Sequence, residues 1–181
     1  RIKVTVDAPV RYLEVPSLES VPHGDWVAAQ RLDANPGTAF VRARATLWEA
    51  SGRELNDVRR LYLSAIKAAP LDPEPLAGLV LVNASMVYTR PALLGEVSRA
   101  MSRLDILGAT GPGPDSARAA LALSRGNRLE ATRLTEGCAS IDAMCGMMHG
   151  LATLDTAAVE AAAGDLSTTR FARGILAETA L

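Results

Sequence analysis

The sequence predicts an all-α fold, and three observations lead to that prediction. Hydrophobic residues make up 49% of the 181 residues, whereas aromatic residues make up only 4%. Alanine and leucine supply most of the apolar content, and both are strong helix formers. A β-sandwich would instead need more Val, Ile, Thr and Tyr. Finally, most of the chain repeats apolar residues at i, i+3 and i+4 between short turn sequences, which is the pattern of packed helices.

Residues 1–24 are the stretch that departs from this pattern. The segment "RIKVTV" alternates Ile2, Val4 and Val6 with polar residues, which is the period of a β-strand. Three prolines before residue 24 exclude a long helix there. We therefore expect an extended leader with short strands over 1–24, which packs along the domain or ends a preceding one. Because the sequence begins with Arg1 rather than Met, we expect it to be a fragment or a processed form. We expect the parent to be a larger, bacterial-type protein.

From residue 25 onward the predicted helices follow one another through short turns. Their starts carry capping residues or proline, and their ends carry glycine or proline. The predicted helical stretches are 25–34, 35–52, 53–70, 73–87, 90–108, 115–126, 128–137 and 142–155, with a last helix pair within 157–181 that turns at Gly164 and Asp165.

The segment "SAIKAAPLDPEPLAGLV" holds three prolines within six residues. Pro70 stops the preceding helix, because a proline in a helix interior clashes with the previous turn. Asp72 is a suitable N-cap for the next helix, and Pro73 and Pro75 fit its first turn, where backbone amides have no helical partner. The triplet therefore predicts a tight joint between two packed helices, not a linker.

A second segment rich in proline and glycine, "GATGPGPD" at 108–115, is predicted to be a connecting loop. Its prolines lack the backbone donors that a bound phosphate would need, so we expect no phosphate site there. Asp115 is predicted to cap the helix that follows. The next two turns are predicted at Gly126–Asn127 and before Asp142, which would cap its own helix.

The helix pair from Phe40 to Leu76 resembles a tetratricopeptide repeat. Phe40 takes the large position of the first helix, Tyr62 and Ala65 take the large and small positions of the second, and Pro70 matches the closing proline. The segments "SRGNRLEATRL" and "AAAGDLSTTRF" resemble the same inner turn.

The match departs from the family pattern in two respects. Leu76 follows Phe40 after 36 residues, whereas the usual period is 34. The glycine usual in the first helix is replaced by Arg44 and Val80.

The resemblance implies a right-handed α-solenoid of three to four antiparallel helix pairs over 25–181. Such a module would bind a peptide or helix of a protein partner in a groove lined by the first helix of each pair. Taking the repeat register at face value, the groove would be lined by Thr38, Val41, Ala45, Trp48, Glu74, Ala77 and Leu81.

An alternative function belongs to a different class. The domain could be a structural spacer or an oligomerisation domain of a bacterial envelope machine, whose N-terminal strand pairs with another chain. Loss of assembly on deleting residues 1–22, with peptide binding retained, would favour this alternative.

Catalysis is not expected. The two histidines are His23, near Asp25, and His149, and the sequence contains no G-x-S-x-G, HExxH, P-loop or G-x-G-x-x-G motif. We interpret His23 as a loop residue beside a helix cap. No cofactor, metal or small-molecule substrate is expected. The cluster Met144, Met147 and Met148 is interpreted as helix core rather than as an adaptable binding surface.

Cys138 and Cys145 lie seven residues apart. On one straight helix their Cα atoms would be about 10.5 Å apart, too far for a disulfide. A turn between them could close the distance, so a disulfide and a pair of buried thiols both remain open. Zinc binding by both cysteines and His149 is a third possibility, but no fourth ligand is evident.

The net charge is −1, with 19 basic and 20 acidic residues. No basic surface is therefore expected to attract nucleic acid or an anionic membrane, and a membrane would be reached only through a larger parent protein or complex. If the cysteines form a disulfide, the sequence favours the bacterial periplasm or envelope, and otherwise the cytoplasm.

Overall fold

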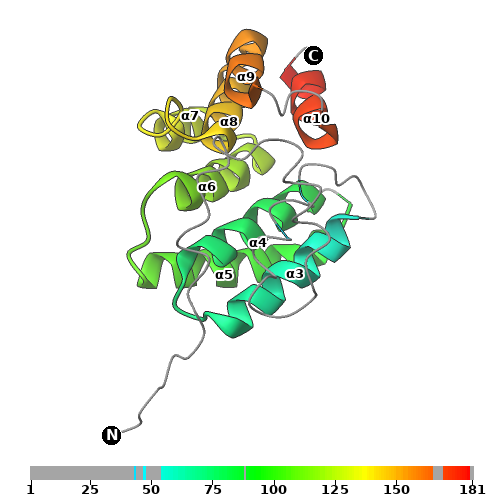
Figure 1. The fold of residues 1–181 in the computed structure, drawn as a ribbon, viewed down its shortest axis with the longest axis vertical. Coiled ribbons are helices and arrows are strands. Elements are labelled where there is room, and N and C mark those ends of the chain that lie inside the picture. Colours follow the sequence, from blue (N-terminus) through cyan, green and yellow to red (C-terminus); the bar gives the residue numbers. More distant parts are fainter. Residues whose placement is uncertain (1–42, 44–46, 48–53, 88, 165–168, 180–181) are drawn as a thin grey trace, which may run out of the picture.

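The computed structural model describes residues 43, 47, 54–87, 89–164 and 169–179. All regular structure in this part of the chain is helical, which confirms the predicted all-α class (Figure 1). The predicted leader over 1–24 and the helix over 25–34 lie outside the described residues. Ala43 and Leu47, within the predicted helix over 35–52, are helical and almost completely buried.

The proline-rich joint between the first two complete helices is as predicted. Helix α3 spans Leu55–Ala68 and α4 spans Pro73–Met86. The Asp72 side chain accepts a hydrogen bond from the Glu74 amide at 3.0 Å, which caps the start of α4. Pro73 and Pro75 therefore occupy a first turn whose amides have no helical partner.

Helix α4 is the central helix of the described structure. Nearly every residue from Pro75 to Met86 is buried, and the helix packs against α3, α5 and α6. This explains its continuous apolar sequence, because a helix covered on several sides needs no polar face. The chain continues through a 3-10 turn, η3 (Pro91–Leu93), into α5 (Leu94–Ile106), which ends before Gly108 at a φ of +61°.

Helix α6 begins earlier than the sequence analysis predicted. It spans Pro112–Ser124, so half of the predicted loop over 108–115 is helical, and Asp115 is not its N-cap. Pro112 and Pro114 lie in the first turn, where proline costs no hydrogen bond. The Asp115 carboxylate instead accepts from the Gly111 amide at 3.3 Å and from Arg118 at 3.2 Å, and so holds the turn from inside the helix.

The C-terminal helices are shorter and begin at side-chain caps. They are α7 (Arg128–Thr135), α8 (Ala143–Thr153), α9 (Thr156–Ala163) and α10 (Arg170–Thr179). Asn127, Asp142 and Asp155 cap the first three of them through hydrogen bonds of 2.9 to 3.2 Å to backbone amides. The predicted turns at Gly126 and Gly164 are confirmed by positive φ angles.

The packing divides the helices into two sets. Helices α4, α6, α8 and α10 form a row in which each contacts the next (Figure 1). Helices α5, α7 and α9 connect successive members of that row, and α3 precedes its first member. Helix α5 packs on α4, α7 on both α6 and α8, and α9 on both α8 and α10. The row begins in the lower half of Figure 1 and ends beside the C-terminus.

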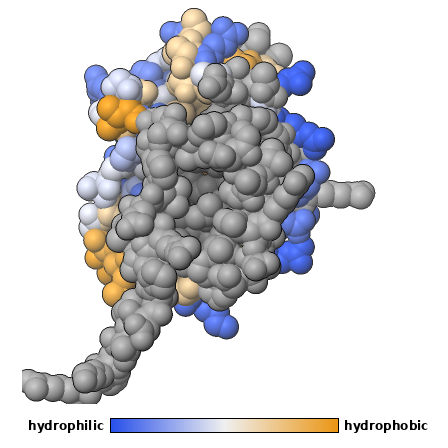
Figure 2. Space-filling view, viewed as in Figure 1, coloured by the Kyte–Doolittle hydropathy of each residue, from blue (hydrophilic) through white to orange (hydrophobic). Residues whose placement is uncertain are grey.

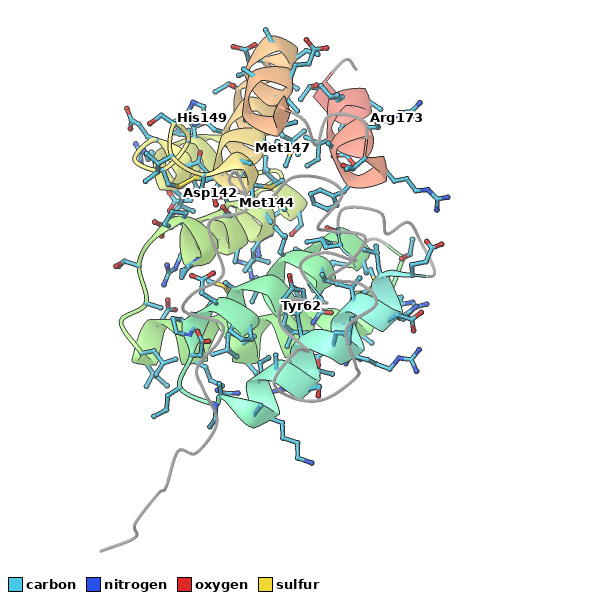
Figure 3. All side chains as sticks on the ribbon, in the orientation of Figure 1. Tyr62, Asp142, Met144, Met147, His149 and Arg173 are labelled. Carbon is cyan, nitrogen blue, oxygen red and sulfur yellow. A yellow bond between two sulfur atoms is a disulfide. The ribbon has the colours of Figure 1, made fainter. Side chains whose placement is uncertain are left out.

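Glycines set the closest approaches between helices. A Cβ at Gly78 in α4 would overlap the ring of Tyr62, the largest fully buried side chain among the described residues. A Cβ at Gly146 or Gly150 in α8 would come within 2.6 Å of Ala162 or Val159 in α9. These glycines, four residues apart on one face, allow the two short helices to pack closely. Figure 3 labels Tyr62, Met144 and Met147 within this packed interior.

Candidate functional site

A groove of about 420 Å³ lies between the four helices of the row. Its lining is mostly apolar, with contributions from α4, α6, α8 and α10 and one residue of α3. Among the described residues, those that line it are Leu55, Leu81, Ala84, Ser85, Ala120, Leu123, Ser124, Met148, Leu151, Arg170, Phe171, Gly174, Ile175 and Glu178.

The groove residues of α4 and α6 occupy equivalent positions in their helices. Helix α4 begins at Pro73 and contributes residues 81, 84 and 85, while α6 begins at Pro112 and contributes residues 120, 123 and 124. Both sets are therefore the ninth, twelfth and thirteenth residues of their helix. Both helices start with P-x-P, and in both the thirteenth residue is a serine. The same spacing of three and four residues recurs at 148 and 151 and at 171, 174, 175 and 178, as expected for one face of each helix.

Two serines give the groove hydrogen-bond acceptors. The Ser85 hydroxyl donates to the Leu81 carbonyl at 3.0 Å, and the Ser124 hydroxyl donates to the Leu121 carbonyl at 2.8 Å. A hydroxyl has one proton, so with these bonds made each serine can only accept from a molecule in the groove.

Charged residues lie on the α10 side of the groove. Arg170 forms an ion pair with Glu54 at 3.5 Å, which joins the start of α10 to the start of α3. Both side chains are about half exposed, so this pair contributes little to stability. Glu178 lies two turns further along α10 and adds a third acceptor group to the lining.

The structure places the predicted groove residues in three different ways. Leu81 lines the groove. Ala77, one turn earlier in α4, is buried in the core, and Glu74 lies half-buried in the first turn of α4, close to the backbone of Gly113. The remaining four, Thr38, Val41, Ala45 and Trp48, lie outside the described residues.

Sequence reasoning missed the groove residues of α6, α8 and α10. The signal was present as the repetition of P-x-P and serine between "PEPLAGLVLVNAS" and "PGPDSARAALALS", which are 39 residues apart. It was missed because 108–115 was interpreted as a loop and because the expected period was 34 residues. The spacing between the starts of α4, α6, α8 and α10 is instead 39, then 31, then 27 residues.

A polar network fixes the side of α4 that carries Asn83. The Glu96 carboxylate of α5 accepts two-pronged hydrogen bonds from Arg59 of α3 at 2.7 to 3.1 Å and a further one from the Asn83 amide at 3.2 Å. Asn83 is completely buried, so its amide needs such a partner. One residue from each of three helices thus ties α4 to α3 and α5.

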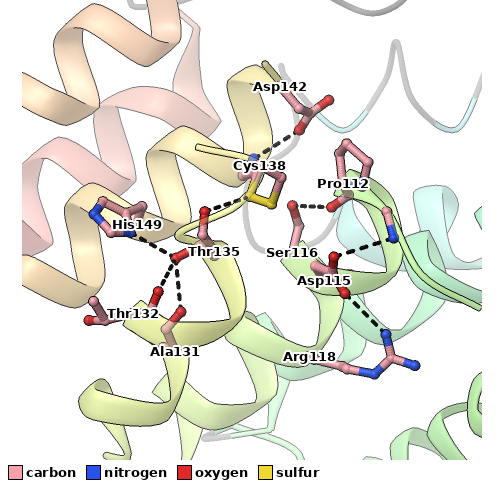
Figure 4. Close-up of a disulfide and its surroundings, with 12 residues drawn as sticks. Pro112, Asp115, Ser116, Arg118, Ala131, Thr132, Thr135, Cys138, Asp142 and His149 are labelled. Carbon is pink, nitrogen blue, oxygen red and sulfur yellow. Dashed lines mark hydrogen bonds and ion pairs between the residues drawn. A yellow bond between two sulfur atoms is a disulfide. The ribbon is translucent and has the colours of Figure 1, made fainter. Parts of the chain in front are cut away.

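Cys138 and Cys145 are joined in a disulfide, with their Cα atoms 5.8 Å apart (Figure 4). Cys138 follows α7 and Cys145 lies in the first turn of α8, so the bond crosses the turn between these two helices. Both residues are buried. The Asp142 carboxylate accepts from the Cys145 amide at 2.9 Å, which fixes the same end of α8.

His149 connects α8 to α7. Its Nδ1 lies 3.0 Å from the Thr135 hydroxyl, whose own proton can go to the Ala131 carbonyl at 2.8 Å (Figure 4). In that arrangement His149 donates from Nδ1 and acts as a tie between helices. No group of three or more potential metal ligands occurs within the described ranges, and His23 lies outside them.

The methionine cluster belongs to the core, as predicted. Met144 and Met147 are buried among the helices. Met148 is buried as well but presents one side to the groove, so it serves both.

In Figure 2 the coloured margin of the molecule is mainly hydrophilic, with small hydrophobic patches between the hydrophilic ones. Among the described residues, the large apolar side chains with the greatest exposure are Ile106 and Leu71. None of the described helices has the combination of length and hydropathy that crossing a membrane requires.

No family model, curated protein or solved structure matches this chain.

Proposed function

We propose that this chain is the partner-binding part of a right-handed, tetratricopeptide-like α-solenoid, and that it serves as an interaction module of a larger assembly. The single observation that supports this function is the apolar groove, because four successive helices of one row each contribute one face to it. A row of helices that share one concave face is how helical repeats build extended binding surfaces. The volume of about 420 Å³ is large enough for several side chains of a partner.

The chemistry of the lining defines the partner. Leucine, isoleucine, phenylalanine and methionine side chains would bury apolar anchors of an amphipathic helix or peptide. The acceptors at Ser85, Ser124 and Glu178 would take hydrogen bonds from N–H groups, including those of Lys or Arg. The partner is therefore a protein segment with spaced apolar residues and at least one basic neighbour.

The disulfide supports a location for this module. Disulfides persist in oxidising compartments, so we place the protein in the bacterial periplasm or envelope rather than in the cytoplasm.

The test is a selection from a displayed peptide library, with oxidised protein as the target, followed by affinity measurements on variants. Ser85→Arg and Gly174→Arg put bulk and positive charge into the groove at exposed positions, and a Cβ at Gly174 meets no atom within 4 Å. We expect each change to lower the affinity for the selected peptides at least tenfold.

Ile106→Arg is the matched control, because Ile106 is 84% exposed and lies outside the groove lining. It should leave affinity unchanged. Circular dichroism should show the same helicity for all variants. Peptides that bind the groove variants as tightly as the wild type, or a library that yields no groove-dependent peptide, would reject this function in favour of the spacer alternative.

A further inference from the structure

The C-terminal half of the described structure, α7 to α10, is built from shorter helices than the first half, α3 to α6. Helices α3 to α6 have 13 or 14 residues, whereas α7 and α9 have eight and α10 has ten. Helices this short are not stable alone and depend on their neighbours. In a repeat array each unit is held by adjacent units only, so the last units can open while the first remain folded.

The disulfide lies within the C-terminal half, in the turn between its first two helices, α7 and α8. It closes a ring over the turn from α7 to α8, and the buried Cys145 lies directly before Gly146, whose Cα faces the Ala139 carbonyl of the same turn. Closing a ring of about eight residues lowers the entropy of the opened state enough to shift an opening equilibrium by roughly 70-fold in the chain-entropy description. The same turn is also held by the Asp142 cap, by amides that donate to the Thr135 and Cys138 carbonyls, and by the contact between Thr135 and His149.

Half of the groove lining depends on the turn between α7 and α8. Helix α8 carries Met148 and Leu151, which lie one and two turns beyond Cys145, and α10 carries five further lining residues. Helix α10 packs mainly on α8 and α9. If the turn before α8 opens, the groove loses this side, while the side formed by α4 and α6 remains.

We propose that the Cys138–Cys145 disulfide makes the groove conditional on redox state: the oxidised chain has a complete groove, and reduction releases the α8 and α10 side. This inference rests on the proposed function for its consequence, but not for its structural part. The disulfide is then a redox-sensitive latch on partner binding.

The chemistry requires a dithiol reductant. A thiolate of the reductant attacks one sulfur of the bond, forms a mixed disulfide and expels the other cysteine as a thiolate, which takes up a proton. The second thiol of the reductant then displaces the first cysteine. Two electrons pass to the chain, which gains two thiols, while the reductant becomes a disulfide. Because both sulfurs belong to buried residues, the attack needs the turn to open first, and a bound partner should slow it.

The test is hydrogen exchange measured by mass spectrometry on oxidised protein, on protein reduced with dithiothreitol, and on the double variant Cys138→Ser/Cys145→Ser. We expect amides of α7 to α10 to exchange roughly 70-fold faster in the reduced protein and in the variant. Amides of α3 to α6 should be unchanged. The variant with dithiothreitol is the control for the reductant and should match the variant without it.

An equal increase in exchange rate in all the described helices, or no increase in any of them, would overturn the latch. A second arm measures the affinity of a library-selected peptide for both redox forms, and we expect at least a tenfold loss on reduction. Unchanged affinity would overturn the dependence of the groove on the disulfide even if exchange changes as expected. If no peptide binds the oxidised protein, the proposed function fails, and the exchange data still decide the latch.

Discussion

Gly78 shows how one residue sets the distance between α3 and α4. Its Cα faces the ring of Tyr62, and a methyl group there would overlap the ring carbons. Tyr62 is fully buried and cannot move aside without repacking the core. We expect Gly78→Ala to lower the free energy of unfolding by about 2 kcal/mol, because overpacking costs more than the gain in helix propensity. Urea denaturation followed by circular dichroism measures this change.

Gly95 in α5 provides the matched control. The nearest atom to a Cβ there is Nη1 of Arg99 at 3.6 Å, which is ordinary contact. Gly95→Ala should therefore be neutral or stabilise by up to about 1 kcal/mol. If both substitutions have the same effect, the contact with Tyr62 does not limit the approach of the two helices.

At the scale of one element, α9 is a short helix whose start depends on a side-chain cap. It has eight residues, and the Asp155 carboxylate accepts from the Ala158 amide at 3.0 Å. We expect Asp155→Ala to destabilise the protein by about 1 kcal/mol and to speed exchange of the α9 amides. Asp155→Asn keeps an acceptor at the same place and should cost much less. Equal losses for Ala and Asn would show that the cap bond does not hold α9.

Element boundaries were predictable where the sequence carries one unambiguous signal. Asp72 before Pro73 marks the start of α4, and Gly126 before Asn127 marks the start of α7, because each residue has a physical preference for that position. The predicted start of α6 was wrong because Pro112 and Pro114 fit a loop as well as a first helical turn. The same reasoning was correct at Pro73, where an aspartate precedes the proline, whereas Gly111 precedes Pro112 and gives no such signal.

At the scale of the whole molecule, the helical class followed from composition, but the groove did not. Leu81 lines the groove, whereas Glu74 and Ala77 of the same helix do not, and the places of Leu123, Met148 and Ile175 depend on how far each helix is shifted along the row. That shift is set by packing, such as Gly150 against Val159, and by helix lengths that fall along the chain. Since these lengths vary, a fixed repeat period cannot place the later helices.

The same decrease in helix length predicts an uneven stability along the molecule. Helix α4 is buried on almost every side by α3, α5 and α6, whereas α10 rests mainly on α8 and α9. In an array with neighbour contacts only, the free energy of local opening should follow this difference. In the oxidised protein we expect native-state hydrogen exchange to give the highest opening free energy in α4 and lower values in α9 and α10. As urea is added, the opening free energies of α9 and α10 should fall at lower concentrations than that of α4. A single opening free energy shared by all helices would instead mean that the described helices unfold as one cooperative unit, in which a local latch at Cys138 and Cys145 could not act on one half alone.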